Sequence, residues 1–162
     1  MRLLPYTCGV KDFRISKHFR FYELTHTRDH PHLLKENRLH FAAEPYLSRL
    51  QCAAEYLLEG TRDEIGCPIY ILSGGRCPTL NSAVGGVPTS QHLFSIPNDG
   101  AFDLTVQLMP IEKVAEAIWF SGLTFYQMRV YVKRNFIHLG APRSKGNLQI
   151  AWIGGTKPEW AI

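Results

Sequence analysis

Residues 71–106 read ILSGGRCPTLNSAVGGVPTSQHLFSIPNDGAFDLTV, and the rest of the chain can be understood as support for the residues in and after this stretch. His92 lies in its polar loop, which is rich in glycine and proline, and Asp103 lies in the short apolar run that follows. A second histidine, His138, stands between apolar neighbours in a later run. Catalytic zinc sites take three protein ligands of this kind and leave the fourth tetrahedral position for water. The pattern therefore predicts a zinc site built from two imidazoles and one carboxylate.

Residue chemistry alone leaves alternatives open at two of these positions and at Arg76. A bare carboxylate is costly to bury in an apolar strand, so Asp103 is either a metal ligand or an edge-exposed or salt-bridged group. A lone histidine in a strand is usually a satisfied core residue, which is the alternative for His138. Arg76 lies in a Gly-rich turn between a predicted strand and a predicted helix. Its planar guanidinium suits a bidentate contact with a substrate carboxylate, and the alternative is a structural arginine that binds loop carbonyls.

Length and composition indicate one ordinary globular domain over residues 1–162. Hydrophobic residues make up 45% of the chain and charged residues 20%, which excludes a disordered protein. The net charge of +4 and the pI of about 8.9 favour anionic partners, such as cell-wall polymers or nucleic acid. Because the chain has no block of about five or six basic residues, nucleic acid is the less supported of the two partners.

Cysteine usage and the lengths of the apolar runs bear on the cellular compartment. Cys8, Cys52, Cys67 and Cys77 form no CxxC pair, which predicts free thiols in a reducing cytoplasm. The apolar run at the start is too short for a signal peptide. No apolar run approaches the ~20 residues of a membrane span. We therefore expect a protein of the producing cell's cytoplasm, without a membrane span or an export signal, and we expect it to be a monomer.

Apolar periodicity and the positions of glycine and proline predict a mixed set of helices and strands. Helices are expected over residues 16–24, 42–58, 79–84 and 110–120, and strands over 68–72, 101–108, 127–132, 135–139 and 148–153. The second helix is expected to have Pro45 in its first turn and to end at Gly60. Strands 127–132 and 135–139 are expected to pair as a hairpin, and Trp160 is expected to dock the end segment.

A polar segment, residues 25–40, carries His26, His30, His32 and His40. Histidines so close together in a sequence can bind a metal ion. Their spacing falls on no clear helix or strand, so we interpret the segment as a solvated loop that is rich in histidine.

The stretch quoted at the start closely resembles the signature of a known family. Residues 73–93, SGGRCPTLNSAVGGVPTSQHL, resemble the SGYRSPxLNxAVGGxPxSQHL signature of the zinc D-alanyl-D-alanine peptidases, in the branch common in phages and bacteria. ISKHF at residues 15–19 and ELT at residues 23–25 resemble the LSKNFTLxELT opening of that branch. FIHL at residues 136–139 resembles its WVHIS or FVHVD ligand strand. The resemblance covers most of the chain.

This resemblance implies an α+β fold in which a small antiparallel sheet is flanked by helices, a Hedgehog/DD-peptidase-like zinc fold. It implies a Zn²⁺ ion whose ligands are His92, Asp103 and His138. Arg76 falls on the family's loop arginine, which grips the substrate and polarises the scissile carbonyl. Ser90 and Gln91 shape the turn before the first ligand and join Arg76 as expected substrate-binding residues.

The function implied by the resemblance is hydrolysis of peptide bonds in peptidoglycan stem peptides. A metal-activated water would attack the bond, and the enzyme would be a DD-carboxypeptidase or an endopeptidase. A wall-directed enzyme without an export signal suits phage-type release, as for an endolysin.

Two departures from the family pattern bear on catalysis. Asp103 stands eleven residues after His92 instead of seven, which indicates a four-residue insertion beside the metal, in the loop 94–99. Asp99 in this loop is a further candidate, as a competing ligand or a catalytic acid. Asn135 stands where many members carry a Glu or Asp general base, and an amide cannot accept the proton. The alternative function is therefore a catalytically impaired, zinc-stabilised peptidoglycan-binding module.

Overall fold

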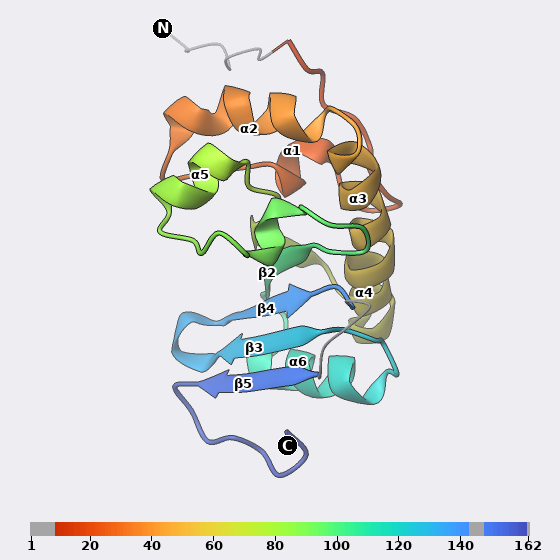
Figure 1. Ribbon diagram of the computed structural model, residues 1–162. Helices are drawn as coiled ribbons and strands as arrows, with labels where there is room; N and C mark the ends of the chain where they lie inside the picture. The colour runs from red at the N-terminus through yellow and green to blue at the C-terminus, as the bar shows by residue number, and fades with distance from the viewer. Residues whose placement is uncertain (1–8, 143–147, 162) are drawn as a thin grey trace, which may run out of the picture.

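A five-stranded sheet forms the centre of the fold (Figure 1). The computed structural model describes residues 9–142 and 148–161. The strands are β1 Ile69–Ser73, β2 Ala101–Val106, β3 Gln127–Tyr131, β4 Phe136–Gly140 and β5 Gln149–Ile153. They lie in the order β1-β2-β4-β3-β5, and each neighbouring pair is antiparallel except β3 and β5, which are parallel. The fold is therefore α+β with a mostly antiparallel sheet, which confirms the predicted class.

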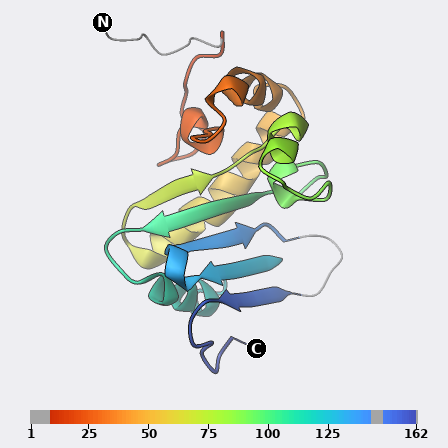
Figure 2. The same cartoon turned by 90° about the vertical axis from the view of Figure 1, so that its left-hand side faces the viewer.

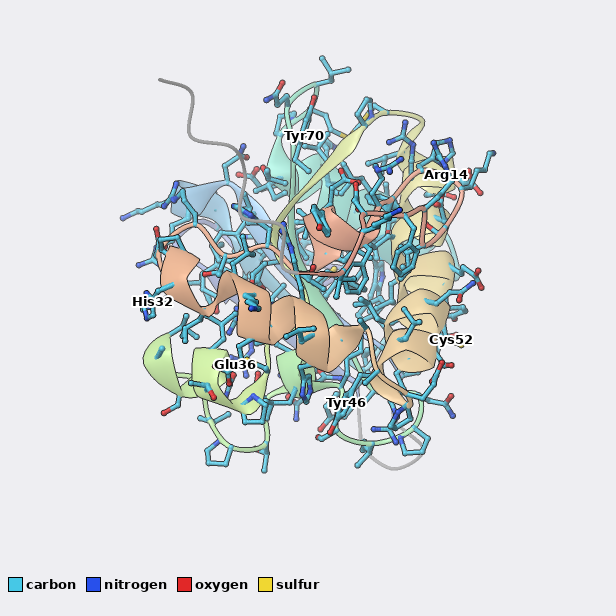
Figure 3. All side chains as sticks on the ribbon, turned by 90° about the horizontal axis from the view of Figure 1, so that it is seen from above. Arg14, His32, Glu36, Tyr46, Cys52 and Tyr70 are labelled. Carbon is cyan, nitrogen blue, oxygen red and sulfur yellow. The ribbon has the colours of Figure 1, made fainter. Side chains whose placement is uncertain are left out.

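The helices form two groups around this sheet (Figures 1 and 2). They are α1 Phe21–Leu24, α2 Leu34–Phe41, α3 Tyr46–Ala53, α4 Gly60–Ile65, α5 Pro78–Ala83 and α6 Ile111–Phe120, with 3₁₀ turns η1 Pro31–Leu33, η3 Gln91–Leu93 and η4 Val132–Arg134 and a π-helical segment, η2 Ala54–Glu59. The run α3–η2–α4 crosses one face of the sheet, and α6 lies on the same face. Helices α1, α2 and α5 gather at the β1 edge. Seen from above, η1 and α2 cross the molecule with His32 near one end and Tyr46 near the other (Figure 3).

The core lies between the sheet and the helices that cover it. Helix α6 buries Ile111, Val114, Ala115 and Ile118, at the steps of three and four that an amphipathic helix requires. Burial of each large aliphatic side chain of this kind contributes about 1.5–3 kcal/mol before the entropy cost is counted. Trp160 stacks on Trp119 with ring centroids 5.9 Å apart, so the end segment docks through this residue as predicted.

The first predicted helix, over residues 16–24, is shorter than expected and begins only at Phe21. Ser16 does not cap it, because its hydroxyl donates to Glu59 Oε1 at 2.6 Å across the fold. The cap is Arg20, whose backbone N–H donates to Glu23 Oε2 at 2.7 Å.

The prediction of a solvated loop over residues 25–40 is wrong from Pro31 onward, because η1 and α2 occupy that part. The apolar pattern is weak here since two of the buried positions on α2 are polar, Asn37 and Arg38. The Arg38 guanidinium carbon lies 3.4 Å from the centroid of the Tyr22 ring, a cation–π contact that no apolar periodicity can reveal.

The long helix also does not end at Gly60. Helical structure continues to Ile65, and Gly66, with a φ of 66°, ends it in the left-handed conformation that glycine adopts without strain. Gly60 is retained inside the helix where a Cβ would lie 2.9 Å from Leu123 Cδ1. Gly60 therefore packs against Leu123 inside the helix and does not terminate it.

Two further findings concern the cysteines and the helix lengths of the described residues. Cys52, Cys67 and Cys77 are free thiols, and Cys8 lies outside the described ranges. None of the helices described is both long and apolar enough to cross a membrane.

Glu59→Gln is expected to lower the free energy of unfolding by about 1–3 kcal/mol near pH 7, measured by urea denaturation. Glu59 accepts hydrogen bonds from Ser16 Oγ at 2.6 Å and from the His18 backbone N–H at 2.7 Å, and its Oε2 lies 2.6 Å from His18 Nδ1. Burial raises the pKa of the Glu59 carboxyl, but these hydrogen bonds outweigh burial and lower that pKa overall.

The pH dependence of this effect has a defined sign. Because the folded-state pKa is lowered, ionised Glu59 stabilises the fold above its unfolded value of 4.5, and this stabilisation is lost as the pH falls through the folded-state pKa. The difference between wild type and variant should therefore shrink in acid. Glu55→Gln, on the same helical run but exposed, is the control; an equal loss of stability in both variants would contradict the assignment.

Candidate metal centre

Three potential metal ligands converge from three elements of the fold. Asp103 on β2 and His138 on β4 are direct cross-strand partners, and His92 comes from the turn η3. Asp103 Oδ1 lies 2.8 Å from His138 Nδ1 and 3.4 Å from His92 Nε2, and the two histidine nitrogens are 3.3 Å apart. One ligand atom from each residue lies within 4.8 Å of the others. The structure thus brings together all three residues that the sequence predicts as ligands.

His92 is held in place by hydrogen bonds on both its backbone and its ring. Its backbone N–H donates to Ser90 Oγ at 3.3 Å, and its backbone carbonyl accepts from the Arg76 N–H at 2.8 Å. Its ring Nδ1 lies 2.8 Å from the Gly74 carbonyl oxygen. Because a carbonyl can only accept, Nδ1 carries the hydrogen, and the lone pair is on Nε2, which faces Asp103 and His138.

Two glycines let this loop pass close to its neighbours. A Cβ on Gly74 would lie 2.2 Å from the Leu24 carbonyl oxygen, and a Cβ on Gly75 would lie 2.5 Å from the ring of Phe41. The Gly75 N–H donates to the same Leu24 carbonyl at 2.8 Å. Gly74 is therefore required by close contact with the backbone at the end of α1, and Gly75 by close contact with the Phe41 ring on α2.

Arg76 contacts the aspartate of the group directly. Its Nη2 donates to Asp103 Oδ2 at 3.1 Å and its Nε donates to Ser73 Oγ at 2.9 Å. The two carboxylate oxygens of Asp103 are thus divided, with Oδ1 toward the histidines and Oδ2 toward the guanidinium. Asp103 therefore forms a salt bridge with Arg76 and also lies among the candidate metal ligands. The sequence left these two roles open as alternatives, and the structure is compatible with both.

The electrostatics of the group favour the protonation states that metal binding needs. Burial raises the pKa of the Asp103 carboxyl, but the charges and hydrogen bonds of His92 and His138 outweigh burial and hold that pKa far below its usual range. Burial lowers the pKa of His138, and Asp103 only partly offsets this. An ionised carboxylate beside a neutral imidazole is the form in which both groups bind a cation.

A cleft of ≈ 510 Å³ lies beside the group and is bordered by Arg76 and by one of its three members, Asp103. The β1 strand and α5 contribute apolar side chains to its wall, including Leu72 and Val84. The loop between α1 and η1, residues 26–29, forms another wall. A peptide segment that enters this cleft would meet a guanidinium and a carboxylate at its base.

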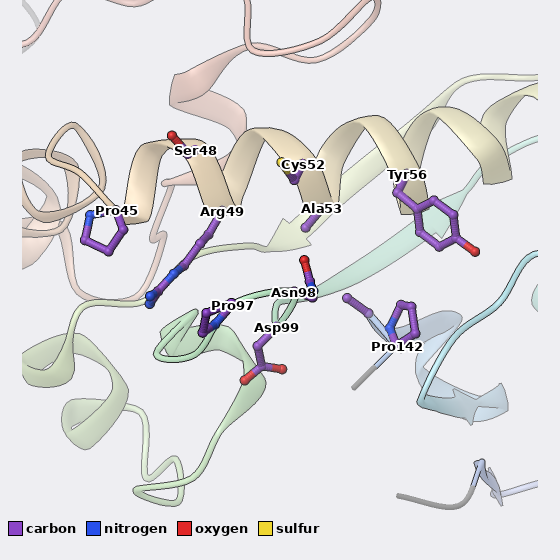
Figure 4. A pocket seen from close by; sticks show the side chains of 11 residues that line it. Pro45, Ser48, Arg49, Cys52, Ala53, Tyr56, Pro97, Asn98, Asp99 and Pro142 are labelled. Carbon is purple, nitrogen blue, oxygen red and sulfur yellow. The ribbon is translucent and has the colours of Figure 1, made fainter. Parts of the chain in front are cut away.

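Asp99 lies apart from this cleft. It borders a separate cavity of ≈ 520 Å³ between the 94–99 loop and α3, together with Arg49 (Figure 4). Its Oδ1 accepts a hydrogen bond from Gln91 Nε2 at 2.8 Å, and the structure does not bring it into the ligand group. Residues 97–99 of the inserted loop border this second cavity, and residues 94–99 are not among those that line the cleft of Arg76.

Ser90 and Gln91 shape the turn before His92, as the resemblance implies. Ser90 caps η3, and the buried Gln91 side chain also donates to the Ala141 carbonyl at 3.3 Å. Neither residue borders the cleft of Arg76. Their contacts within the described residues give them a positioning role, through the backbone that carries His92.

Asn135 is an amide in a left-handed turn, with a φ of 53°. Its backbone carbonyl accepts a hydrogen bond from Thr105 Oγ1 at 2.6 Å, and its side-chain Nδ2 lies 3.5 Å from the same oxygen. From this hairpin Phe136 borders the cleft, and Asn135 does not. The hairpin therefore supplies no acid to the cleft among the residues described.

A His–Asp–His group beside a cleft is typical of a metal-dependent hydrolase. The family model described as Peptidase M15 matches residues 34–140, which is more than half of the chain. The chain therefore belongs to the Peptidase M15 family, which implies a metallopeptidase, and the family is zinc-dependent in general. Comparison with curated proteins and with solved structures gave no significant match.

Asn37 is the supporting residue that sequence reasoning missed. Its Nδ2 donates to the carbonyls of Thr25 and Gly75, each at 2.9 Å, and its Oδ1 accepts from the Cys77 N–H at 2.6 Å. It is fully buried on α2. No periodicity distinguishes it, because its contacts are polar and distant in sequence.

Asn37→Ala is expected to destabilise the protein by about 2–4 kcal/mol in urea denaturation, because two carbonyls and one N–H would lose their buried partner. Leu39→Ala, two residues along the same helix and 48% exposed, is the matched control and should change stability by less than about 1 kcal/mol. Similar losses for the two variants would show that the amide has no such role.

Proposed function

We propose that this member of the Peptidase M15 family is a zinc-dependent peptidase that hydrolyses peptide bonds in peptidoglycan stem peptides, as a DD-carboxypeptidase or endopeptidase. The observation that carries the proposal is the convergence of His92, Asp103 and His138, with Asp103 bordering the same cleft as Arg76. The net charge of +4 supports an anionic polymer as the partner.

The donor set suits zinc. Two imidazole nitrogens and one carboxylate oxygen make a three-ligand set of the type found in catalytic zinc sites, where the fourth position is left to water. The Gly74 carbonyl accepts from Nδ1 of His92, which is the outer-shell hydrogen bond that orients a zinc-binding imidazole. When bound, zinc supplies a Lewis acid and a water that loses a proton near neutral pH.

Arg76 is proposed to bind and orient the substrate. Its guanidinium borders the cleft, and Nε and Nη2 are fixed by Ser73 and Asp103. A guanidinium held in this way presents its remaining N–H groups to a substrate carboxylate or to a carbonyl oxygen that gains negative charge. The apolar wall from β1 and α5 would exclude water around the bound peptide.

The proposed substrate is part of the cell wall, whereas the protein is made in the cytoplasm. We propose that the protein reaches peptidoglycan after phage-type release from the cytoplasm, and that it acts as a monomer. In this respect it would resemble an endolysin.

A second candidate function is a zinc-stabilised module that binds peptidoglycan without cleaving it. Asn135 favours this function, because an amide occupies the position where many family members carry the general base. Incubation of the zinc-loaded protein with purified sacculi separates the two functions. Release of peptide fragments or free D-alanine supports the peptidase, and binding without release supports the module.

Protein purified without chelator is expected to hold one zinc per chain by elemental analysis. His92→Ala and His138→Ala should each lose most of the bound zinc and all muropeptide cleavage, because either change leaves two ligands. His32→Ala, an exposed histidine outside the ligand group, is the control and should retain both. Zinc-free wild-type protein would count against the proposed function.

Arg76→Lys is expected to lower kcat/KM for muropeptide cleavage by about 10²–10³-fold, because an ammonium cannot reproduce the forked contact with a developing oxyanion. Zinc content should remain near one per chain, since Arg76 is not in the ligand group. Arg28→Lys, at the wall of the same cleft, serves as the control. An unchanged kcat/KM in Arg76→Lys would remove Arg76 from the proposed mechanism.

A further inference from the structure

The cleft contains few groups that can exchange a proton with a substrate. Its titratable and charged members are His26, Arg28, Asp29, Arg76 and Asp103. Asp103 belongs to the ligand group, and the two arginines stay protonated through catalysis. If the protein hydrolyses peptides, His26 and Asp29 are therefore the candidates among these groups for transferring the proton.

The backbone that carries His26 is fixed directly against the metal-centre loop. Asn37 donates to the carbonyl of Thr25, the residue before His26, and to the carbonyl of Gly75, the residue before Arg76. The carbonyl of Leu24 also accepts from the Gly75 N–H at 2.8 Å. The buried amide of Asn37 thus binds the residue before His26 and the residue before Arg76. Both His26 and Arg76 border the same cleft.

Asp29 is less suited than His26 to this role. Its Oδ1 already accepts a hydrogen bond from Arg28 Nε at 3.0 Å, and exposure does not separate the two residues, because both are exposed. It also stands four residues beyond the last backbone unit that Asn37 holds. The ring of His26 has no hydrogen-bond partner among the described residues, so both of its nitrogens are available to a substrate or a water.

We propose that His26, supplied by the loop between α1 and η1, is the proton-exchanging catalytic residue of this site. The assignment rests on the proposed peptidase function. In family members with an acid at the position of Asn135, the hairpin supplies the group that exchanges the proton. In this protein the α1–η1 loop supplies it. An imidazole can serve first as a base and then as an acid in one reaction.

The proton balance of the step is simple. As the water oxygen bonds to the scissile carbonyl carbon, one water proton passes to a ring nitrogen of His26. As the C–N bond breaks, that proton passes to the leaving amine nitrogen. The net change is addition of water across the peptide bond, and His26 ends in its starting form.

The test uses the full-length, zinc-loaded protein with purified sacculi and soluble muropeptides. His26→Gln is expected to lower kcat by about 10²–10⁴-fold with little change in KM, because proton transfer is lost while the cleft is retained. Zinc content and melting temperature should stay at wild-type values. Added imidazole should restore part of the activity of His26→Ala, and the acid limb of the wild-type pH–rate profile should change in His26→Gln.

His32→Gln is the matched control, since His32 is an exposed histidine of the same segment that does not border the cleft. It should keep the wild-type kcat. If wild type cleaves muropeptides and His26→Gln cleaves them at the same rate, the role of His26 is overturned and the peptidase function stands. If zinc-loaded wild type cleaves nothing, both the peptidase function and the role of His26 are overturned.

Discussion

The register of β2 against β4 is the constraint on which the site depends. It sets Asp103 directly opposite His138, so that one carboxylate oxygen lies 2.8 Å from one imidazole nitrogen. Side chains alternate between the faces of a strand, and a slip of one residue would therefore turn either ligand to the other face. The register is in turn fixed by burial of Phe102, Leu104, Ile137 and Leu139, the neighbours of the two ligands. The apolar core and the metal centre are thus specified by the same alternation.

Asp103 is also the electrostatic centre of the site. Taken out of water, a carboxylate is stable only when it is paired, and here two imidazoles and one guanidinium surround it. Burial raises the pKa of the Asp103 carboxyl, but the two histidines outweigh burial and hold that pKa far below its usual range. A cation bound between the histidines would add to the same stabilisation. The carboxylate that binds the Arg76 guanidinium is therefore also the one that faces the two histidines.

Sequence patterns could predict the elements that are determined by residues close together in the chain. The strands that carry Asp103 and His138, and the loop that carries His92, follow from apolar alternation and from the positions of glycine. Helix α2 could not be predicted in this way, because its buried face includes Asn37 and Arg38, whose contacts are with backbone carbonyls and an aromatic ring. The same holds for the borders of the cleft. No spacing in the sequence indicates that residues 26–29 lie beside Arg76, since the links are the side-chain amide of Asn37 and a backbone hydrogen bond from Gly75 to Leu24.

The unusual spacing between His92 and Asp103 is tolerated because both ends of the intervening loop are fixed independently. His92 is held by Gly74 and Arg76, and Asp103 by the pairing of β2 with its neighbours. Between them, Phe94 enters the core in a left-handed conformation. Arg49 on α3 donates to its carbonyl at 2.8 Å, and Gln91 donates to Asp99. The extra residues are thus led toward α3 and away from the cleft. The length of the loop between His92 and Asp103 therefore does not set the positions of the candidate ligands. A seven-residue spacing is not required to bring the three of them together.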